Sequence, residues 1–170
     1  RQYVIVNDME ELEAKQEKQY FSMIKKLRKG IPLEHITHQK EFMKLNFFIN
    51  ENVLIPRQDT EILVEEVINI ANKTKAKKIL DLCTGSGAIA VSLAKYLPNV
   101  QITAIDISND ALKIAKKNAR TNNVEEQITF ISSDMFTNLN EEKFDIIVSN
   151  PPYIKTKIIS TLDKEVRNEP

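Results

Sequence analysis

The fold of this chain is decided by one stretch, Asp81-Leu-Cys-Thr-Gly-Ser-Gly-Ala-Ile-Ala90. The apolar run Lys78–Leu82 predicts a short buried strand, and residues 88–97 predict a helix that ends before Pro98. Glycines at positions 85 and 87 allow a tight turn between the two elements and leave room for a ligand at the helix N-terminus. Since the chain has only 3 glycines, this pair indicates a turn with a function.

Short apolar segments alternate with amphipathic helices from residue 59 onward. Further strands are expected at residues 100–105, 127–131 and 144–148. One helix is expected to begin with Asp59 or Thr60 as its N-cap, and another with Ser108. The expected buried faces are Ile62, Leu63, Val67 and Ile70 in the first helix, and Ala111, Leu112, Ala115 and Ala119 in the second. This alternation is typical of a parallel, doubly wound α/β sheet.

The first 57 residues differ from this pattern. Residues 1–40 are expected to be helical, with capping-box spacing from Asp8 to Glu11 and a stop at Gly30 and Pro32. The apolar residues at helical spacing in this segment are Leu12, Tyr20, Ile24 and Leu27. Residues 41–55 are rich in aromatic and β-branched side chains, and they predict a hairpin that turns at residues 50–52.

The composition excludes several classes of protein. Charge is balanced at 24 basic and 24 acidic side chains, which argues against a non-specific nucleic-acid binder. One cysteine excludes a disulfide framework and a multi-cysteine zinc site. His35 and His38 have no third ligand in view, so no metal site is expected. No apolar run approaches about 18 residues, so we expect a cytoplasmic protein without a membrane span.

The glycine loop and an acid on the next strand predict an adenosine-type cofactor. Asp106 ends the strand that follows the loop, where a carboxylate can accept both ribose hydroxyls. The spacing Gly85-x-Gly87-x-x-Ala90 does not itself distinguish a nicotinamide from S-adenosyl-L-methionine. Asp81 favours the latter, because a carboxylate suits an ammonium and a sulfonium better than a pyrophosphate. The alternative is that Asp81 only caps the loop by accepting backbone N–H groups. Cys83 is expected to be a small buried thiol.

The segment Asn150-Pro-Pro-Tyr153 follows the last predicted strand directly. Ligands bind at the carboxyl ends of strands in open α/β sheets, so this segment should lie beside the cofactor. Two prolines fix the backbone and leave its carbonyl groups free, and Asn150 adds an acceptor and two donors. Together these groups can hold a planar NH₂ group by both hydrogens, with Tyr153 against its flat face. The alternative is a simple Pro-Pro turn that ends a strand.

These motifs resemble those of class I S-adenosyl-L-methionine-dependent methyltransferases that act on planar nitrogen. Motif I resembles residues 81–85, motif II ends in Asp106, and motif IV resembles Asn150-Pro-Pro-Tyr153. Three motifs alone leave open a DNA or RNA amino-group methyltransferase acting on adenine-N6 or guanine-N2. The flanking segments resemble one family more specifically, the protein-(glutamine-N5) methyltransferases of the HemK/PrmC group. The resemblance lies in residues 27–33, Glu41, Phe42 and Phe47, and above all in residues 53–61.

The resemblance implies a fold, an activity and a set of partners. By this resemblance, residues 1–40 form the C-terminal part of a helical substrate-docking domain, and residues 41–57 form a β-hairpin linker. Residues 58–170 then form the N-terminal part of a Rossmann-like methyltransferase domain. The family methylates the glutamine of the Gly-Gly-Gln motif in class 1 peptide chain release factors. S-Adenosyl-L-methionine is the cofactor and S-adenosyl-L-homocysteine its product. We therefore expect a release factor as the protein substrate, a monomer, and no direct nucleic-acid or membrane partner.

The resemblance also implies a role for each matching residue. The expected cofactor-binding residues are Asp81, Leu82, Cys83, Thr84, Gly85, Gly87, Asp106, Met135 and Asn150. The expected catalytic and substrate-binding residues are Asn150, Pro151, Pro152 and Tyr153. Cys83 stands where the family commonly has glycine, so we expect that position not to require a positive φ. Gln58 replaces a frequent proline, and Arg57, Thr60 and Glu61 match the family.

The family sheet has seven strands, and this chain predicts four of them. We therefore expect a part of a longer protein, because a sheet that ends at the strand 144–148 would expose an apolar edge. Two further hypotheses remain. A binding module that has lost turnover is disfavoured by the intact Asn150-Pro-Pro-Tyr153 segment. A nicotinamide dehydrogenase is disfavoured because no acid–base pair for hydride transfer is in view.

Overall fold

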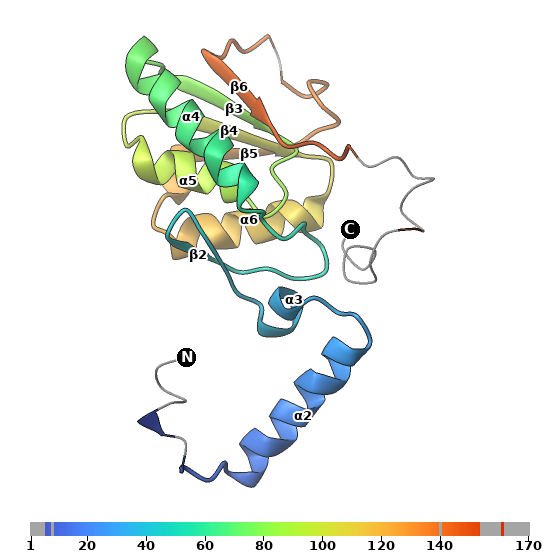
Figure 1. Ribbon diagram of the computed structural model, residues 1–170. Helices are drawn as coiled ribbons and strands as arrows, with labels where there is room; N and C mark the ends of the chain where they lie inside the picture. Colours follow the sequence, from blue (N-terminus) through green and yellow to red (C-terminus); the bar gives the residue numbers. More distant parts are fainter. Residues whose placement is uncertain (1–5, 8, 140, 154–160, 162–170) are drawn as a thin grey trace.

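The computed structural model describes residues 6–7, 9–139, 141–153 and 161, and its centre is a parallel four-stranded sheet (Figure 1). The strands are β3 (Lys78–Leu82), β4 (Gln101–Asp106), β5 (Ile128–Ser132) and β6 (Ile146–Ser149). They lie in the order β5-β4-β3-β6, and all neighbouring pairs are parallel. The predicted α/β fold class is thus confirmed.

Three helices form one layer against this sheet: α4 (Asp59–Thr74), α5 (Ala88–Tyr96) and α6 (Asn109–Thr121). Helix α5 packs between α4 and α6 and also contacts β4 and β5. The main hydrophobic core lies in this layer and includes fully buried Ile79, Leu93 and Ile102. A smaller cluster of Leu80, Leu82, Ile105 and Leu139 occupies the other face of the sheet.

Helix α6 forms as predicted. The Ser108 hydroxyl oxygen accepts a hydrogen bond from the Ala111 N–H at 3.2 Å, which satisfies one of the free donors at the helix N-terminus. The four predicted apolar residues are buried, and Lys113, Lys116, Lys117 and Arg120 are exposed. The buried face also contains Ile114 and Asn118.

Helix α4 differs from the prediction at its start and on its buried face. Its N-cap is Gln58, which is already in the helical region, so neither Asp59 nor Thr60 caps it. The buried residues are Val64, Val67 and Ala71, whereas Ile62 is 67% exposed. The segment contains two overlapping apolar stripes of helical spacing, and contact with α5 and β6 selects one of them.

A hairpin precedes α4, but its turn lies elsewhere than predicted. Strands β1 (Lys40–Phe42) and β2 (Leu45–Phe47) pair antiparallel and are joined by Met43 and Lys44, whose φ angles are 50° and 58°. Two positive φ angles match a tight I′-type hairpin turn, which normally contains asparagine or glycine. Residues 50–52 form a separate turn, in which the Val53 N–H donates to the Asn50 carbonyl at 3.2 Å.

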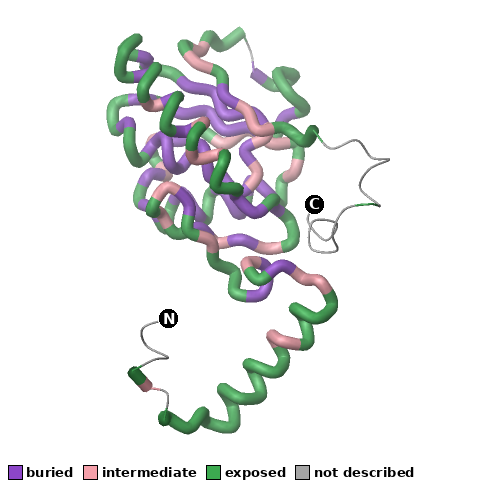
Figure 2. Tube along the Cα trace, in the orientation of Figure 1, coloured by how far each residue is buried: buried purple, intermediate pink, exposed green. Residues whose placement is uncertain are grey.

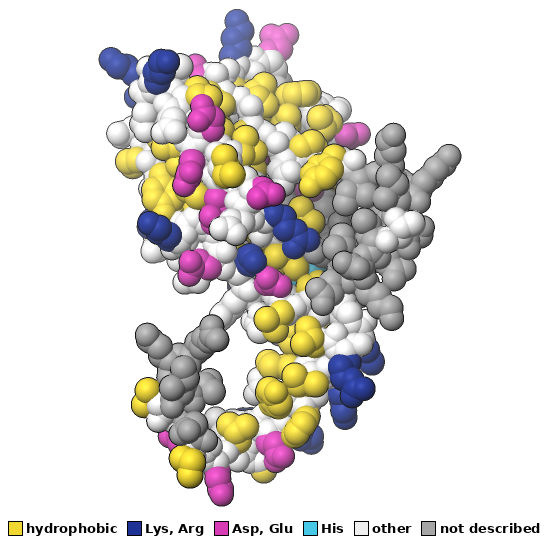
Figure 3. Space-filling model, in the orientation of Figure 1, with side chains coloured by type: hydrophobic (Ala, Val, Ile, Leu, Met, Phe, Trp, Pro, Cys, Tyr) yellow, Lys and Arg dark blue, Asp and Glu magenta, His cyan; other side chains and the backbone are white. Residues whose placement is uncertain are grey.

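The part of the N-terminal region that the structure describes contains α2 (Ala14–Arg28) and α3 (Leu33–Thr37). Helix α2 begins at Ala14 with a capping box at Glu13 and Gln16, in which the Glu13 N–H lies 2.9 Å from Gln16 Oε1. Asp8, the predicted N-cap, lies outside the described residues. Helix α2 ends before Gly30 as predicted. No residue of α2 is buried (Figure 2), and hydrophobic side chains lie exposed along it (Figure 3). Within the described ranges, no helix is both long and apolar enough to cross a membrane.

Candidate active site

The sheet brings the predicted motifs together at the carboxyl ends of β3, β4 and β6. Strand β3 lies between the other two, with Leu82 opposite both Ile105 and Ser149. The Ser149 hydroxyl donates to the Leu82 carbonyl at 2.8 Å, which joins the end of β6 to the start of the loop. The loop after β3, Asp106 after β4 and Asn150 after β6 are therefore neighbours, as the strand-end rule predicts.

Gly85 and Gly87 have different structural roles. Both have positive φ, 55° and 78°. A Cβ atom built on Gly87 would lie 3.0 Å from the Ala115 Cβ atom, so the absence of a side chain lets α6 pack against the loop. A Cβ atom built on Gly85 would meet no atom within 4 Å among the described residues. Space on the Gly85 side of the loop is thus open to a ligand.

Asp81 is a fully buried acid beneath this loop. Its Oδ2 atom accepts hydrogen bonds from the Thr84 hydroxyl at 2.6 Å and the Ala90 N–H at 3.2 Å. Its Oδ1 atom is buried as well and accepts no hydrogen bond from any described residue. Burial raises the pKa of Asp81 to about 7, although both hydrogen bonds oppose the shift, and the Asp106 charge raises it further. Asp81 therefore caps the loop and keeps one acceptor unused.

Asp106 holds the other side of the loop. Its Oδ2 atom accepts from the Gly85 N–H at 2.8 Å, and its Oδ1 atom accepts from the Ser108 N–H at 2.9 Å. A carboxylate oxygen can accept a second hydrogen bond, so neither contact removes its capacity to bind a hydroxyl group. Asp106 thus fixes the loop next to the start of α6.

Cys83 contradicts two predictions. Its φ angle is 60°, so the position is left-handed although the residue carries a Cβ atom. The Thr84 N–H donates to the Ile105 carbonyl at 2.8 Å, and this sheet-like bond fixes the backbone directly after Cys83. The side chain is half-buried and not fully buried. Partial burial and the nearby charges of Asp106, Asp81 and Asp134 raise the pKa of the Cys83 thiol, which marks the site as acidic.

Met135 lies on the segment that follows β5. Its φ angle is 49° and its side chain is 47% exposed. The Ser133 hydroxyl donates to the Met135 carbonyl at 3.0 Å, and the Ser133 N–H donates to the Asp106 carbonyl at 3.0 Å. These contacts attach the Met135 turn to the end of β4. Met135 therefore stands next to the predicted cofactor-binding residues and not within the core.

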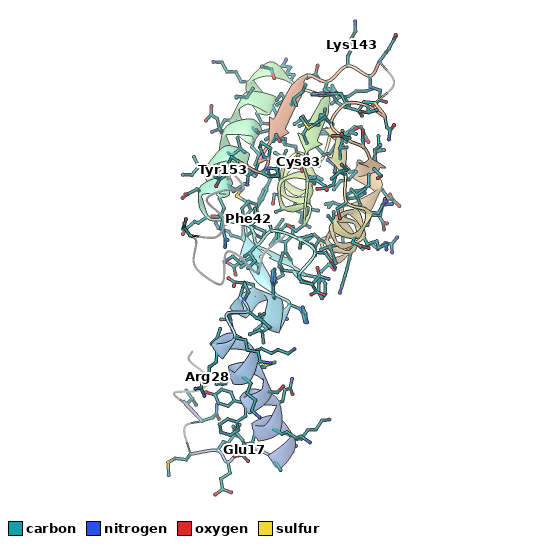
Figure 4. All side chains as sticks on the ribbon, turned by 90° about the vertical axis from the view of Figure 1, so that its right-hand side faces the viewer. Glu17, Arg28, Phe42, Cys83, Lys143 and Tyr153 are labelled. Atoms are coloured by element: carbon teal, nitrogen blue, oxygen red, sulfur yellow. The ribbon has the colours of Figure 1, made fainter. Side chains whose placement is uncertain are left out.

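The segment Asn150-Pro-Pro-Tyr153 leaves β6 at the same end of the sheet. The Asn150 amide nitrogen lies 3.4 Å from the Thr60 hydroxyl oxygen in the first turn of α4. Two motifs far apart in the sequence are thus adjacent. Pro151, Pro152 and Tyr153 are exposed, Tyr153 at 80%. Figure 4 shows Tyr153 and Cys83 at similar height in the view. Phe42 lies below them, and Lys143 lies at the top, near the start of β6.

The two histidines lie in and directly after α3, where they contact the linker and not this site. His35 is buried and lies 3.4 Å from the Val53 carbonyl oxygen, while His38 Nδ1 lies 3.0 Å from the Ile49 carbonyl oxygen. No group of three or more potential metal-ligating side chains occurs among residues that the structure describes.

The contacts that connect this site to the linker were not predicted from the sequence. The Asn118 side chain, 0% exposed on α6, bonds to both Ser86 of the loop and Phe48 after β2. Asparagine is a poor residue for a helix interior, and position 118 falls on the same helical face as Ala111 and Ala115. A polar amide on a predicted buried face is the signal in the sequence that could have identified Asn118.

The residues present fit the cofactor that the motifs suggest. Asp81 offers an unused buried carboxylate oxygen to an ammonium group, and the acids around Cys83 favour a cation. The Gly85 side of the loop leaves space for the ligand to approach. The acids at this site therefore match the cationic S-adenosyl-L-methionine better than a pyrophosphate.

Two family models match the chain. The model described as methyltransferase small domain matches residues 57–165, and the one described as PrmC N-terminal domain matches residues 1–37. Residues 38–56 lie between the two matches. The two matches together cover both the sheet domain and the N-terminal helices.

Curated relatives and solved structures agree with these matches. The chain is 43% identical to a release factor glutamine methyltransferase of Clostridium acetobutylicum, over 99% of this chain and 60% of that protein. It is 42% identical to one of Shewanella oneidensis, over 100% of this chain and 59% of that protein. The chain thus spans about three fifths of these relatives. A SAM-dependent methyltransferase from Agrobacterium tumefaciens shares the fold, with a TM-score of 0.55 and 20% identity over 67% of this chain and 39% of that one.

Proposed function

This chain belongs to the methyltransferase small domain family, and on that premise we propose that it methylates the side-chain amide nitrogen of a glutamine in a class 1 peptide chain release factor. The proposed target is the glutamine of the Gly-Gly-Gln motif, and S-adenosyl-L-methionine is the proposed methyl donor. The match of residues 1–37 to the PrmC N-terminal domain and the names of the relatives support this substrate.

One observation carries the proposal: the order β4-β3-β6 puts two acids and Asn150 on adjacent strand ends. The acids supply a site for a cation, and Asn150 supplies a carboxamide beside it. S-Adenosyl-L-methionine, when bound, supplies an electrophilic methyl group on a sulfonium. The residues that would hold it are Asp81, Asp106, Gly85, Met135 and the loop between Asp81 and Gly87.

The chain's own task is to position and activate a weak nucleophile. An amide nitrogen is a poor nucleophile because its lone pair is delocalised. The Asn150 side-chain oxygen and the carbonyl groups around Pro151 and Pro152 can accept hydrogen bonds from both N–H groups of a glutamine amide. Such contacts favour the rehybridised nitrogen, and they act through positioning and preorganised electrostatics. The nitrogen loses one proton to solvent water after the new bond forms, so no dedicated general base is required.

The contact between Asn150 and Thr60 gives this arrangement a fixed support. Thr60 lies in the segment 53–61 that most specifically resembles the glutamine methyltransferases. Glu61, the next residue, accepts a hydrogen bond from the Met43 N–H at 2.6 Å in the hairpin turn. The first turn of α4 thus contacts both the proposed amide-binding segment and the linker.

Transfer of a labelled methyl group tests the proposed substrate. The purified protein is incubated with labelled S-adenosyl-L-methionine and three acceptors: a class 1 release factor, its Gln→Ala variant in the Gly-Gly-Gln motif, and mixed DNA and RNA. We expect label in the unaltered release factor alone. Label in nucleic acid with none in the release factor would establish an amino-group methyltransferase of nucleic acid instead.

A further inference from the structure

Asn118 makes contacts that neither strand-end geometry nor the proposed chemistry explains. Its side-chain amide nitrogen donates to the Ser86 carbonyl at 2.8 Å and to the Phe48 carbonyl at 3.0 Å. Its side-chain oxygen accepts from the Phe48 N–H at 2.7 Å. The carboxamide is fully buried, so these three bonds are made away from water. One side chain of α6 thus joins two backbone segments that lie far apart in the sequence.

Ser86 is the central residue of the cofactor loop, between Gly85 and Gly87. The Asn118 bond draws its carbonyl oxygen toward α6, on the side where Gly87 meets Ala115. The Gly85 N–H donates to Asp106 Oδ2 at 2.8 Å. The loop is therefore fixed at two points, the Gly85 N–H and the Ser86 carbonyl.

Phe48 is itself held in place. The His38 ring stacks on the Phe48 ring with centroids 5.4 Å apart and an angle of 17°, and the Lys117 Nζ atom lies 3.1 Å from the ring centroid. Aromatic stacking and a cation–π contact both restrict the ring. Because the Phe48 backbone is bonded to Asn118, the linker after β2 and the cofactor loop share one anchor.

We propose that Asn118 is a positioning residue of the cofactor loop, and that it couples the loop to the linker through the backbone of Phe48. The inference rests on the proposed function in taking residues 81–87 as the loop that binds S-adenosyl-L-methionine. Asn118 does not touch the reacting groups. It acts by holding the Ser86 carbonyl so that the loop is already in the geometry that accepts the cofactor.

Asn122 provides a matched control. It is the C-cap residue of α6, one turn after Asn118, and it is buried; its side-chain amide donates to the Asn46 carbonyl at 3.1 Å and the Asn118 carbonyl at 2.9 Å. Asn122 therefore bonds to the same linker from the same helix. Among the described residues, both hydrogen bonds donated by its side chain go elsewhere than to the cofactor loop. A general loss of helix–linker packing should affect both variants, whereas a positioning role should affect only Asn118.

The test compares Asn118→Ala with Asn122→Ala in two measurements. In the cofactor-free protein, we expect amide hydrogen exchange at residues 85–87 to be about tenfold faster in Asn118→Ala and unchanged in Asn122→Ala. By titration calorimetry, we expect the Kd for S-adenosyl-L-homocysteine to rise about tenfold in Asn118→Ala and to stay near the wild-type value in Asn122→Ala. Equal effects of both variants on the loop and on Kd would overturn the proposal.

Asn118→Asp covers the case in which Asn118→Ala does not fold. It keeps the side-chain volume and the acceptor for the Phe48 N–H, and it replaces both donors with an acceptor facing the Ser86 carbonyl. We expect faster exchange at residues 85–87 and a raised Kd in this variant too, and wild-type values for both would overturn the proposal. If the wild-type protein binds no S-adenosyl-L-homocysteine, the proposed function fails, while the hydrogen-exchange comparison still decides the role of Asn118.

Discussion

Asp81 shows how one buried carboxyl group can serve both the fold and a ligand. Its Oδ2 atom stabilises the loop through Thr84 and Ala90, while its Oδ1 atom is buried without a partner among the described residues. A buried polar atom without a hydrogen bond is costly in a protein that binds nothing there. The unused acceptor is therefore the feature of this residue that most favours a bound cation.

The pKa of Asp81 predicts how cofactor affinity depends on pH. Burial raises this pKa to about 7, so the carboxyl group is ionised above pH 7 and neutral below it. An ammonium group binds the ionised form, and we therefore expect the Kd for S-adenosyl-L-homocysteine to be about tenfold higher at pH 6 than at pH 8. Calorimetry at both pH values measures this ratio.

Asp81→Asn is the control for this pH dependence. The variant cannot ionise at position 81, so its Kd should be high at both pH values and should change little between them. The same ratio of Kd values in Asp81→Asn and in the wild type would assign the pH dependence to another group.

The backbone conformation of Cys83 costs free energy, and the sequence pattern did not predict this cost. With φ at 60°, its Cβ atom crowds the backbone, which costs about 1–2 kcal/mol for a residue other than glycine. We expect Cys83→Gly to leave the free energy of unfolding within about 1 kcal/mol of the wild type, because the relief is offset by the entropy of glycine in the unfolded chain. Cys83→Val should lower it by about 1–3 kcal/mol, since a β-branched side chain tolerates this region poorly.

Urea unfolding of the two Cys83 variants measures both values. A valine variant as stable as the wild type would show that the backbone at this position leaves the left-handed region at little cost. The thiol itself contributes little to the comparison, because the side chain is only half-buried.

The contact between the cofactor loop and α6 is the central feature at the scale of elements. Gly87→Ala would bring a methyl group to 3.0 Å from the Ala115 Cβ atom and 3.1 Å from its Cα atom, where backbone must move. Gly85→Ala would meet no described atom within 4 Å, so it carries only the cost of a positive φ. We expect Gly87→Ala to be less stable than Gly85→Ala by about 1–3 kcal/mol, the usual cost of overpacking.

Thermal or urea unfolding of the two glycine variants, without cofactor, measures this difference. Equal stability would mean that α6 moves away from the loop easily and that the close packing is not a constraint. The cofactor-free condition matters, because a methyl group at Gly85 would also occupy the space open to a ligand.

Elements with one dominant local signal could be predicted from the sequence. Strand β3 is a short apolar run between polar segments, and its bounds are confirmed. Helix α6 has one apolar face and a serine N-cap, and both are confirmed. In these elements the local pattern and the tertiary packing favour the same arrangement.

Elements whose geometry depends on distant partners could not be predicted. The β1–β2 turn uses Met43 and Lys44 in place of asparagine or glycine, and contacts with two other elements support it. The Met43 N–H donates to Glu61 Oε1 at 2.6 Å, and the Tyr96 hydroxyl donates to the Met43 carbonyl at 2.7 Å. The buried stripe of α4 is likewise selected by α5 and β6. Such contacts leave no local signal in the sequence.

At the scale of the whole molecule, topology explains why the candidate site could be predicted at all. Strand ends collect on one side of a parallel sheet, so Asp81, Asp106 and Asn150 could be placed together before their contacts were known. The hydrogen bonds that connect the cofactor loop to α6 could not be predicted in this way. Asn118 and Ser86 meet only because α6 packs against the loop, and the sequence contains no motif that spans both.

The two parts of the proposed reaction lie on different strand ends. In the proposed function, the cofactor binds at the ends of β3 and β4, and the amide binds at the segment after β6. Tyr153 is 80% exposed, and its predicted place against a planar amide remains a prediction that concerns the complex with substrate. Variants at Asn150 should therefore affect methyl transfer far more than cofactor affinity.

The most direct test of the central claim is single-turnover methyl transfer to a release factor by Asn150→Ala, with Asn52→Ala, at an exposed position, as the control. Removing one preorganised polar group of this kind lowers a rate constant about 100-fold or more. We predict such a loss in Asn150→Ala, with S-adenosyl-L-homocysteine still bound and with wild-type transfer in Asn52→Ala. Wild-type transfer by Asn150→Ala would contradict the account.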